Sequence, residues 1–332
     1  MKQLVLFLGA LGAGVLLFGV LISGVGWNEI WEVLRDFSFS HALFVFLLTL
    51  AFLSASVLRW YFILKRQGCA ISFGAAWKTY LAGFSLWFFV PMFPFANELL
   101  RASLLKERYH VELPKGMASV ITDRILEVTS NLLMVLVGGI IFLLLGDRVS
   151  YSSKTIAVML FVGIWVLLLL LLYMRLFQKR SIVRLFWKEN GGAQEAEQEV
   201  FRFFQVRKAT FWEGIGLSLL KGIIGIVRAA VIIFFFGKGI ALLPAVTAHA
   251  FYYLAVLVPI PAALGSHEVL QTLAFEALGL GAGTGVAFAL VVRSIEILFA
   301  ATGLILLFHF GLRFLLRLMS RKGVKLLKFI FP

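Results

Sequence analysis

One pattern occurs twice in this chain, and it constrains the fold more than any other feature. The first copy interrupts an apolar stretch at Val90-Pro91-Met92-Phe93-Pro94, places Glu98 after the interruption, and continues into an apolar segment carrying Arg124-Ile-Leu-Glu127. The second copy has Val258-Pro259-Ile260-Pro261, then Glu268, then Arg293-Ser-Ile-Glu296. The glutamate precedes the arginine by 26 residues in the first copy and by 25 in the second. Because proline breaks helices and composition alone does not produce this spacing, we interpret the pattern as a structural repeat.

The composition is that of a membrane protein. Of the 332 residues, 61% are hydrophobic and 14% are charged, and the mean hydropathy is +0.98, far from the balance of a soluble domain. Windows without charge cover residues 3–28, 37–58, 79–97, 128–146, 155–174 and 239–266, and several are long enough to cross a bilayer. The sequence therefore predicts an all-α, polytopic membrane bundle.

We expect about eight transmembrane helices in a single bundle over residues 1–312, together with two proline-broken segments that are short or re-entrant. The expected helices cover roughly 4–25, 41–64, 74–92, 116–146, 155–174, 212–236, 243–260 and 284–312. Residues 27–37 have the pattern of a short interfacial helix. The repeat units cover about 74–146 and 243–312, and the basic residues of 313–332 predict a tail on the membrane surface.

Residues 175–211 are the only sizeable polar stretch. Arg180, Arg184 and Lys188 recur every four residues among apolar side chains, which predicts a basic amphipathic helix on the cytoplasmic surface. The glutamate-rich stretch after Gly191-Gly192 is interpreted as a turn. We expect this segment to link the two halves of the bundle.

The basic residues predict the orientation of the chain. Lys2, the Lys65-Arg66 pair, residues 106–115, residues 175–208 and the tail are placed inside, because cytoplasmic loops carry an excess of lysine and arginine. The loops at 26–40, 147–154 and 237–243 then lie outside. This arrangement predicts a multi-pass protein of the plasma membrane with both termini cytoplasmic. When each broken segment is counted as one traverse, the helix before Pro91 runs outward and the helix before Pro259 runs inward, so the two copies are inverted, as in many transporters.

Charged groups in apolar helices are expected to face the interior and to pair, since a charge at the bilayer centre costs about 2.5–3.5 kcal/mol. Arg124 and Glu127 are three residues apart, as are Arg293 and Glu296, so each pair shares a helical face. Two interpretations remain open. The charges are structural ion pairs that lock an inverted bundle, or they line a polar cavity for a charged or zwitterionic headgroup, whose phosphate suits the planar fork of arginine.

Other charges receive weaker expectations. Arg59 is expected to extend toward the headgroups, with an interior position as the alternative. Asp123 starts the charged cluster of the first copy, and an interface residue is the simplest interpretation of it. Lys221 and Arg228 are seven residues apart and share a helical face, which makes them candidates for further phosphate contacts. If the repeats are related by pseudo-symmetry, Glu98 and Glu268 approach a shared centre with Arg124 and Arg293 beside them.

Enzyme signatures are poor. His267-Glu268 opens like a zinc-peptidase helix but lacks the second histidine, and the five histidines and three aspartates show no metal-ligand spacing. Cys69 is the only cysteine, which excludes an intrachain disulfide. We therefore expect no catalytic residues, no metal and no cofactor. Nucleic acid would be one partner for a net charge of +14, but the distribution of that charge favours anionic lipid headgroups instead.

The chain also resembles a known family. The residues that carry the resemblance are Arg59-Trp60, Pro94 with Glu98 and Arg101, Asp123-Arg124, Pro259 with Pro261, Gly265 and Glu268, and Arg293. This ordered set resembles the lysylphosphatidylglycerol synthase transmembrane family, also called the flippase-like family. One member is the flippase half of the multiple peptide resistance factor, which moves aminoacylated phosphatidylglycerol between leaflets. Other relatives are linked to polyprenyl or hopanoid lipids.

The resemblance implies functional positions at Glu98, Arg101, Arg124, Glu268 and Arg293. Family members usually have glycine where this chain has Asn97, and a Pro-Gly-Gly-Leu-Gly run where it has Pro261-Ala-Ala-Leu-Gly265. Alanine adopts fewer backbone conformations than glycine, so the second break is expected to be stiffer here.

These observations together predict a lipid flippase or a lipid-linked carrier, for a phospholipid or polyprenyl-type lipid with a charged headgroup. A solute or ion secondary transporter is the first alternative, and a non-transporting subunit that partners a lipid synthase or glycosyltransferase is the second. No soluble aminoacyl-transfer domain follows residue 332, so we expect that this chain alone does not make the lipid. The candidate substrate-binding residues are Glu98, Arg101, Arg124, Glu127, Glu268, Arg293 and Glu296.

Overall fold

A computed structural model describes residues 2–91, 95–145, 153–178, 181, 191–205, 208–239, 242–258 and 260–319. Within these ranges the secondary structure is helical, without strands. The helices are α1 (Lys2–Val25), α2 (Trp27–Arg35), α3 (Phe39–Arg66), α4 (Phe73–Phe89), α5 (Ala96–Tyr109), α6 (Leu113–Leu145), α7 (Ser153–Phe177), α9 (Gly191–Gln205), α10 (Lys208–Phe235), α11 (Leu242–Val256), the 3₁₀ turn η1 (Pro261–Ala263), α12 (Ser266–Ala277) and α13 (Ala282–Met319).

Five of the described helices are long and apolar enough to cross a bilayer, namely α1, α3, α6, α10 and α13. Large apolar side chains project outward from them and from α7, for example Leu16, Ile164 and Ile305. Such side chains suit contact with lipid tails. The polytopic helical bundle expected from the sequence is therefore confirmed.

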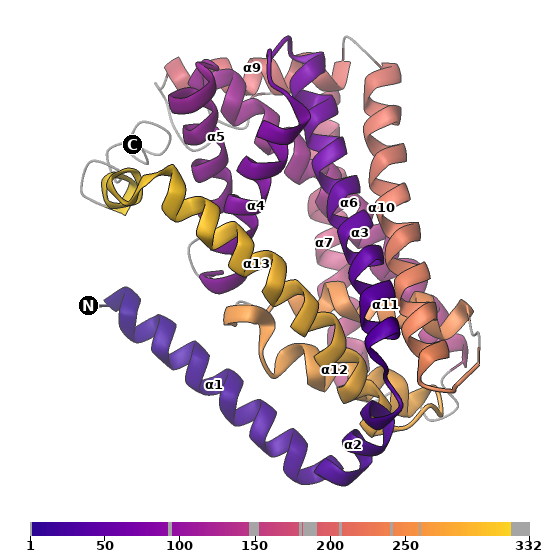
Figure 1. The fold of residues 1–332 in the computed structure, drawn as a ribbon. Coiled ribbons are helices and arrows are strands. Elements are labelled where there is room, and N and C mark those ends of the chain that lie inside the picture. The colour runs from indigo at the N-terminus through magenta and orange to yellow at the C-terminus, as the bar shows by residue number, and fades with distance from the viewer. Residues whose placement is uncertain are drawn as a thin grey trace.

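The helices on either side of the first proline break, α4 and α5, form a hairpin. Helices α4 and α5 pack against each other along their lengths, and α5 returns to the end of the bundle from which α4 started (Figure 1). The 17 residues of α4 span about 25 Å at 1.5 Å per residue, less than the roughly 30 Å of a hydrocarbon core. The segment 74–92, expected as a full span, is therefore the first arm of this hairpin.

The second break builds a matching hairpin from the opposite end. Helix α11 enters the bundle, the chain turns through η1, and α12 returns beside α11. Both helices lie near the end of the bundle that carries α2, whereas α4 and α5 lie near the end crossed by α9 (Figure 1). Pro94 and Pro259 lie outside the described residues. The two hairpins thus have opposite directions, which confirms the inverted repeat.

Each hairpin packs on the long helix of the other repeat. Helix α4 lies against α13, and α11 lies against α6. The helices that precede the hairpins, α3 and α10, pack extensively on each other (Figure 1). The repeat therefore includes one more helix than expected from the sequence, α3 in the first unit and α10 in the second.

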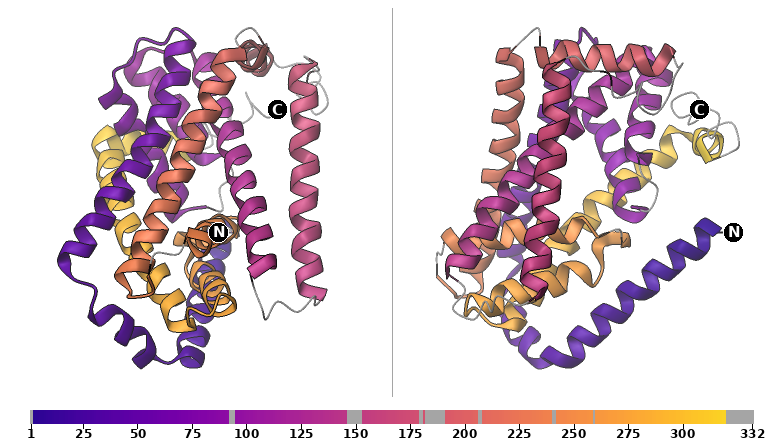
Figure 2. Two further views of the ribbon diagram at one scale, coloured as in Figure 1. Left: turned by 90° about the vertical axis from the view of Figure 1, so that its right-hand side faces the viewer. Right: turned by 180° about the vertical axis from the view of Figure 1, so that it is seen from behind.

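The polar linker differs from the expectation. Residues 182–190, the heart of the predicted basic helix, lie outside the described residues. The glutamate-rich stretch predicted as a turn is instead helix α9, which lies across one end of the bundle (Figure 2). The turn prediction was wrong because Ala196, Val200, Phe203 and Phe204 recur at helical spacing and are buried against α6, α7 and α10.

Two helix ends also differ from the expectation. Helix α13 continues to Met319, beyond the predicted end at residue 312. Helix α1 packs mainly on η1 and α12 and lies at the edge of the molecule (Figure 1). Its contact with the second hairpin is close at Gly14, where a side chain would collide with Ile260 and with the carbonyl of Leu264.

Candidate functional site

Asp123 is the centre of the first cluster of charges. Its two carboxylate oxygens accept hydrogen bonds from Arg59 Nε at 2.7 Å and from Arg101 Nη2 at 2.8 Å. Arg59 on α3 is fully buried, and Nη1 also donates to Ser218 of α10. The expectation that Arg59 extends toward the headgroups was therefore wrong, as was the interpretation of Asp123 as an interface residue. The two groups lie inside because each compensates the charge of the other.

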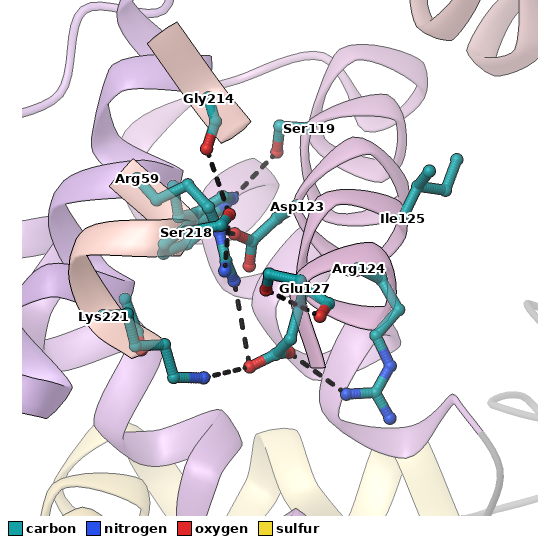
Figure 3. A network of polar contacts seen from close by, with 12 residues as sticks. Arg59, Ser119, Asp123, Arg124, Ile125, Glu127, Gly214, Ser218 and Lys221 are labelled. Atoms are coloured by element: carbon teal, nitrogen blue, oxygen red, sulfur yellow. Dashed lines mark hydrogen bonds and ion pairs between the residues drawn. The ribbon is translucent and has the colours of Figure 1, made fainter. Parts of the chain in front are cut away.

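Glu127 connects the same cluster to helix α10. It accepts a hydrogen bond from Lys221 Nζ at 2.7 Å and one from Arg124 Nη1 at 3.2 Å, and Arg59 Nη2 lies 3.8 Å away. Figure 3 shows Lys221 and Arg124 approaching Glu127 from opposite sides. The pairing of Arg124 with Glu127 follows the three-residue spacing, whereas the partnership with Lys221 could not be read from the sequence.

Arg101 is held by rings as well as by Asp123. Its guanidinium lies 3.9 Å from the ring centroid of Trp60 and 4.7 Å from that of Tyr80. The Trp60 indole N–H donates to Ser119, which fixes the ring against α6. A buried guanidinium between two aromatic faces and a carboxylate is strongly positioned. Arg101 therefore acts in the packing of the first hairpin on α3 and α6.

Arg124 stands out because 42% of its side chain is exposed. Its Nε lies 3.5 Å from a carboxylate oxygen of Glu98, and its Nη1 bonds Glu127. The first cluster contains the cations Arg59, Arg101, Arg124 and Lys221 and the carboxylates of Glu98, Asp123 and Glu127. Four cations and three carboxylates leave a formal excess of one positive charge, and the most accessible of those cations is Arg124.

The second cluster is organised by Glu296 on α13. This carboxylate accepts hydrogen bonds from Arg293 Nη1 at 2.7 Å and from the hydroxyl of Tyr252 at 2.8 Å. Arg228 Nη1 lies 3.6 Å from the same carboxylate, and its guanidinium lies over the ring of Phe52. The ammonium group of Lys221, which belongs to the first cluster, lies over the same Phe52 ring, 4.9 Å from its centroid. The two clusters are therefore neighbours along α10.

Glu98 and Glu268 occupy the same position in the two hairpins. Each is the third residue of the helix that returns from the tip, α5 or α12. The Glu268 carboxylate accepts a hydrogen bond from the backbone N–H of Gly265 at 2.7 Å, and this bond caps α12. The positive end of a helix dipole also stabilises a carboxylate at this position. Glu268 thus has a structural role at the tip.

The hairpin tips meet at a small cleft, which we call the hairpin cleft. Its described lining consists of Trp87, Phe88 and Pro91 from the first hairpin, Val256, Val258, Ile260, Ala262 and Ala263 from the second, and Arg293 from α13. Arg293 is the only charged residue of this lining, and its guanidinium lies 5.2 Å from the centroid of Phe88. The Nε of Arg293 has no hydrogen-bond partner among the described residues.

The backbone at this cleft is strained. Ala262 and Ala263 have φ angles of 54° and 46°, in the left-handed region that favours glycine. They are the two alanines at which the resemblance led us to expect a stiffer break.

The structure places six of the seven predicted site residues in the two clusters, and the seventh, Glu268, at the tip of the second hairpin. Glu98, Arg101, Arg124 and Glu127 belong to the first, and Arg293 and Glu296 to the second. The tips share the hairpin cleft, but neither Glu98 nor Glu268 is part of its described lining, and Glu98 lies beside the arginine of its own repeat. Among the described residues no group of three or more metal-ligating side chains could hold a metal ion.

Four further residues complete the clusters, and sequence reasoning assigned none of them a central position: Arg59, Asp123, Lys221 and Arg228. A signal for two of them was present. Arg59 lies 14 residues before Phe73, where α4 begins, and Arg228 lies 14 residues before Leu242, where α11 begins. Arg59 pairs with Asp123 and approaches Glu127 on α6, while Arg228 approaches Glu296 on α13. Extending the repeat upstream would have brought them into the site.

A comparison with protein families agrees with this architecture. The family model described as the lysylphosphatidylglycerol synthase TM region matches residues 5–321. No curated protein and no solved structure matches the chain.

Proposed function

The chain belongs to the lysylphosphatidylglycerol synthase transmembrane family, and from this premise we propose that it moves a lipid with an anionic headgroup between the leaflets of the membrane. The family suggests a membrane domain associated with lipid metabolism or lipid flipping. The substrate-binding role of the charged residues and the transport step are our proposal. In it the chain acts as a carrier and catalyses no covalent chemistry.

One observation carries the proposal, namely the position of Arg293 in the hairpin cleft. Two re-entrant hairpins that enter from opposite ends expose the same cleft to either side when one tip moves relative to the other. A guanidinium there offers a planar set of donors to a phosphate group. The Nε of Arg293 is buried without a hydrogen-bond partner among the described residues, so it remains a donor for such a contact once the tips move apart. The lipid tails would remain in the bilayer, beside the apolar outer faces of the helices.

Arg124 supports the same proposal from the first cluster. Its partly exposed guanidinium and the excess positive charge around it favour an anionic group. By contrast, Arg59, Arg101 and Arg228 are buried, are paired with carboxylates and do not line the hairpin cleft, so we assign them to the structure of the bundle. The two interpretations of the charges, structural pairs and substrate contacts, thus apply to different residues.

We further propose the plasma membrane as the location, with α9 and both termini on the cytoplasmic side. The last turns of α3 and α5, which contain Lys65, Arg66 and Lys106, lie at the end of the bundle crossed by α9 (Figure 1). Cytoplasmic ends of membrane proteins are enriched in such residues. Anionic or zwitterionic lipids are the proposed partners, and a lipid synthase or glycosyltransferase would act before or after transport.

The test is a leaflet-exposure assay in proteoliposomes that contain labelled phosphatidylglycerol. We expect Arg293→Lys to slow lipid movement by about tenfold or more, because a lost hydrogen bond to a charged group costs about 1.5–3 kcal/mol. Arg124→Lys is expected to slow it as well. The matched control is Arg66→Lys, since Arg66 is 41% exposed and pairs with Glu213 but lies outside both clusters. Unchanged movement in both Arg293→Lys and Arg124→Lys would remove the headgroup-binding role.

The same proteoliposomes separate the two alternatives. Movement of a soluble anion without movement of lipid would favour a solute transporter. A folded protein that moves neither, but that binds a lipid synthase or glycosyltransferase, would favour a non-transporting subunit.

A further inference from the structure

The second hairpin contains two buried histidines that the proposed transport step does not use. His267 on α12 is fully buried, and neither of its ring nitrogens has a hydrogen-bond partner among the described residues. His249 on α11 is also buried, and its Nε2 likewise has no partner there. An imidazole always carries at least one N–H donor, and burying such a donor without an acceptor is costly. Retaining His267 at this position therefore calls for an explanation.

The ring of His267 lies beside the second charge cluster. Tyr252 presents its ring edge-on to His267 at 5.4 Å between centroids, and the Tyr252 hydroxyl bonds Glu296. Arg293 and Arg228 both lie within electrostatic reach of the imidazole. The charged or titratable groups around it are Arg293 and Glu296 on α13, Tyr252 and His249 on α11, Arg228 on α10, and Glu268 on α12 itself. The described side chains of α1, which also packs on α12, carry no charge.

These groups balance without a charge on His267. Arg228 and Arg293 supply two positive charges, and the carboxyl groups of Glu268 and Glu296 supply at most two negative charges. A proton on His267 would add an uncompensated positive charge that faces both guanidinium groups. In a buried site such a charge is strongly unfavourable. The imidazole is therefore neutral in this arrangement.

An anion in the hairpin cleft would reverse this balance, because Arg293 belongs to both the cleft and the cluster. We propose that His267 is a proton-binding site linked to anion binding in the cleft: one proton is taken up on a ring nitrogen as one headgroup binds to Arg293. The proton comes from water and leaves again when the headgroup is released. This inference rests on the proposed function and names a proton as its second substrate.

The consequence is proton-coupled movement. A monoanionic headgroup and a proton together add no net charge to the buried site, which lowers the cost of carrying the headgroup through the bilayer. Because the same site takes up both, a proton gradient biases the direction in which the lipid moves. His249 is not assigned this role, because its charged neighbours are Arg228 and Lys221, whereas His267 lies within electrostatic reach of Arg293, the charged residue of the cleft lining.

The test measures proton uptake on binding, without any transport step. Dihexanoyl phosphatidylglycerol is added to the full-length protein in weakly buffered detergent solution, with a pH indicator and calorimetry as readouts. We expect an uptake of about one proton per bound lipid, and an affinity that rises by up to about tenfold for each unit by which the pH falls, because binding and proton uptake are linked.

Substitutions assign the proton to one residue. His267→Gln should still bind the lipid but lose the uptake and the pH dependence, whereas His249→Gln should keep both. His110→Asn is the control, because His110 is exposed in the turn between α5 and α6. If His267→Gln does not fold, His267→Phe preserves a ring against Tyr252 and serves the same purpose.

The outcomes distinguish this inference from the proposed function. Binding without proton uptake, or uptake that persists in His267→Gln, overturns the inference. If lipid still moves in the leaflet assay in that case, the proposed function stands without proton coupling. Absence of any lipid binding overturns the inference too, because no anion would then compensate Arg293.

Discussion

Asp123 shows how a single residue holds the first half of the bundle together. It lies next to Arg124 in the sequence, yet its carboxylate serves Arg59 from α3 and Arg101 from α5. Both guanidinium groups are almost completely buried. Removing this carboxylate would leave two buried cations without their nearest counter-ion, which is one of the few single changes that destabilise a protein strongly.

We predict that Asp123→Asn lowers the free energy of unfolding by about 3–5 kcal/mol, as expected when a buried ion pair loses one partner. Thermal unfolding in detergent measures this effect. The matched control is Glu213→Gln, which breaks the exposed pair with Arg66 and should cost about 1 kcal/mol or less. Equal effects of the two changes would contradict the central position of Asp123.

Ala262 offers a change that should stabilise the protein. A left-handed backbone costs an L-residue about 1–2 kcal/mol, and the extra flexibility of glycine costs about 0.5–1 kcal/mol. Ala262→Gly is therefore expected to raise stability by about 0.5–1 kcal/mol, the difference between these costs. In Ala301→Gly, within α13, the same replacement should destabilise by about 1 kcal/mol because the backbone is helical there. A lower melting temperature for Ala262→Gly would show that the tip is not strained.

At the scale of helices, each long helix contacts the hairpin of the other repeat through a glycine. A side chain at Gly138 of α6 would collide with Ala250 of α11, and one at Gly303 of α13 would collide with the backbone of Leu81 of α4. Glycine permits this close approach because it has no Cβ. The two hairpins are thus held by the same kind of contact.

Two adjacent glycines in α6 test this packing. Gly138 faces α11, whereas a Cβ at Gly139 would meet no atom within 4 Å. We predict that Gly138→Ala destabilises the protein and separates α6 from α11. By contrast, Gly139→Ala should stabilise it by about 0.5–1 kcal/mol through the higher helix propensity of alanine. Melting of the two variants in detergent provides the comparison, and similar shifts would refute the contact.

For the whole molecule, the inverted hairpins and the long helices define two ends of the bundle. One end carries α9 and the turn after α3, and the other carries α2 and the turn after α10 (Figures 1 and 2). The basic residues favour the α9 end as cytoplasmic. This sidedness determines from which side of the membrane each hairpin enters the bundle.

Cysteine labelling tests the sidedness. In intact cells, an impermeant maleimide should label Lys238→Cys at the turn after α10, and it should label Gln198→Cys on α9 only after permeabilisation. Both residues are exposed. Native Cys69 should contribute little background, because it is buried in the turn after α3 and burial raises the pKa of its thiol, so that less reactive thiolate is present at neutral pH. A Cys69→Ser background removes it altogether. The reverse labelling pattern would invert the proposed topology.

The sequence alone was enough to establish a polytopic helical membrane protein, an inverted repeat around two breaks, and the pairing of Arg124 with Glu127 and of Arg293 with Glu296. These follow from hydropathy, from proline and from helical periodicity, which are local properties of the chain. It did not identify α4 and α11 as hairpin arms, nor α9 as a helix, because those depend on packing against distant elements.

The tertiary structure decided which charges are structural and which are accessible. Arg59 and Arg124 are both arginines in apolar helices, yet one is fully buried between α3, α6 and α10 and the other is partly exposed. The two arginines differ in exposure only because α3, α5, α6 and α10 converge on Asp123 and Glu127. The hairpin cleft likewise forms from two tips far apart in the chain, so its single arginine acquires its position from the fold and from no local pattern.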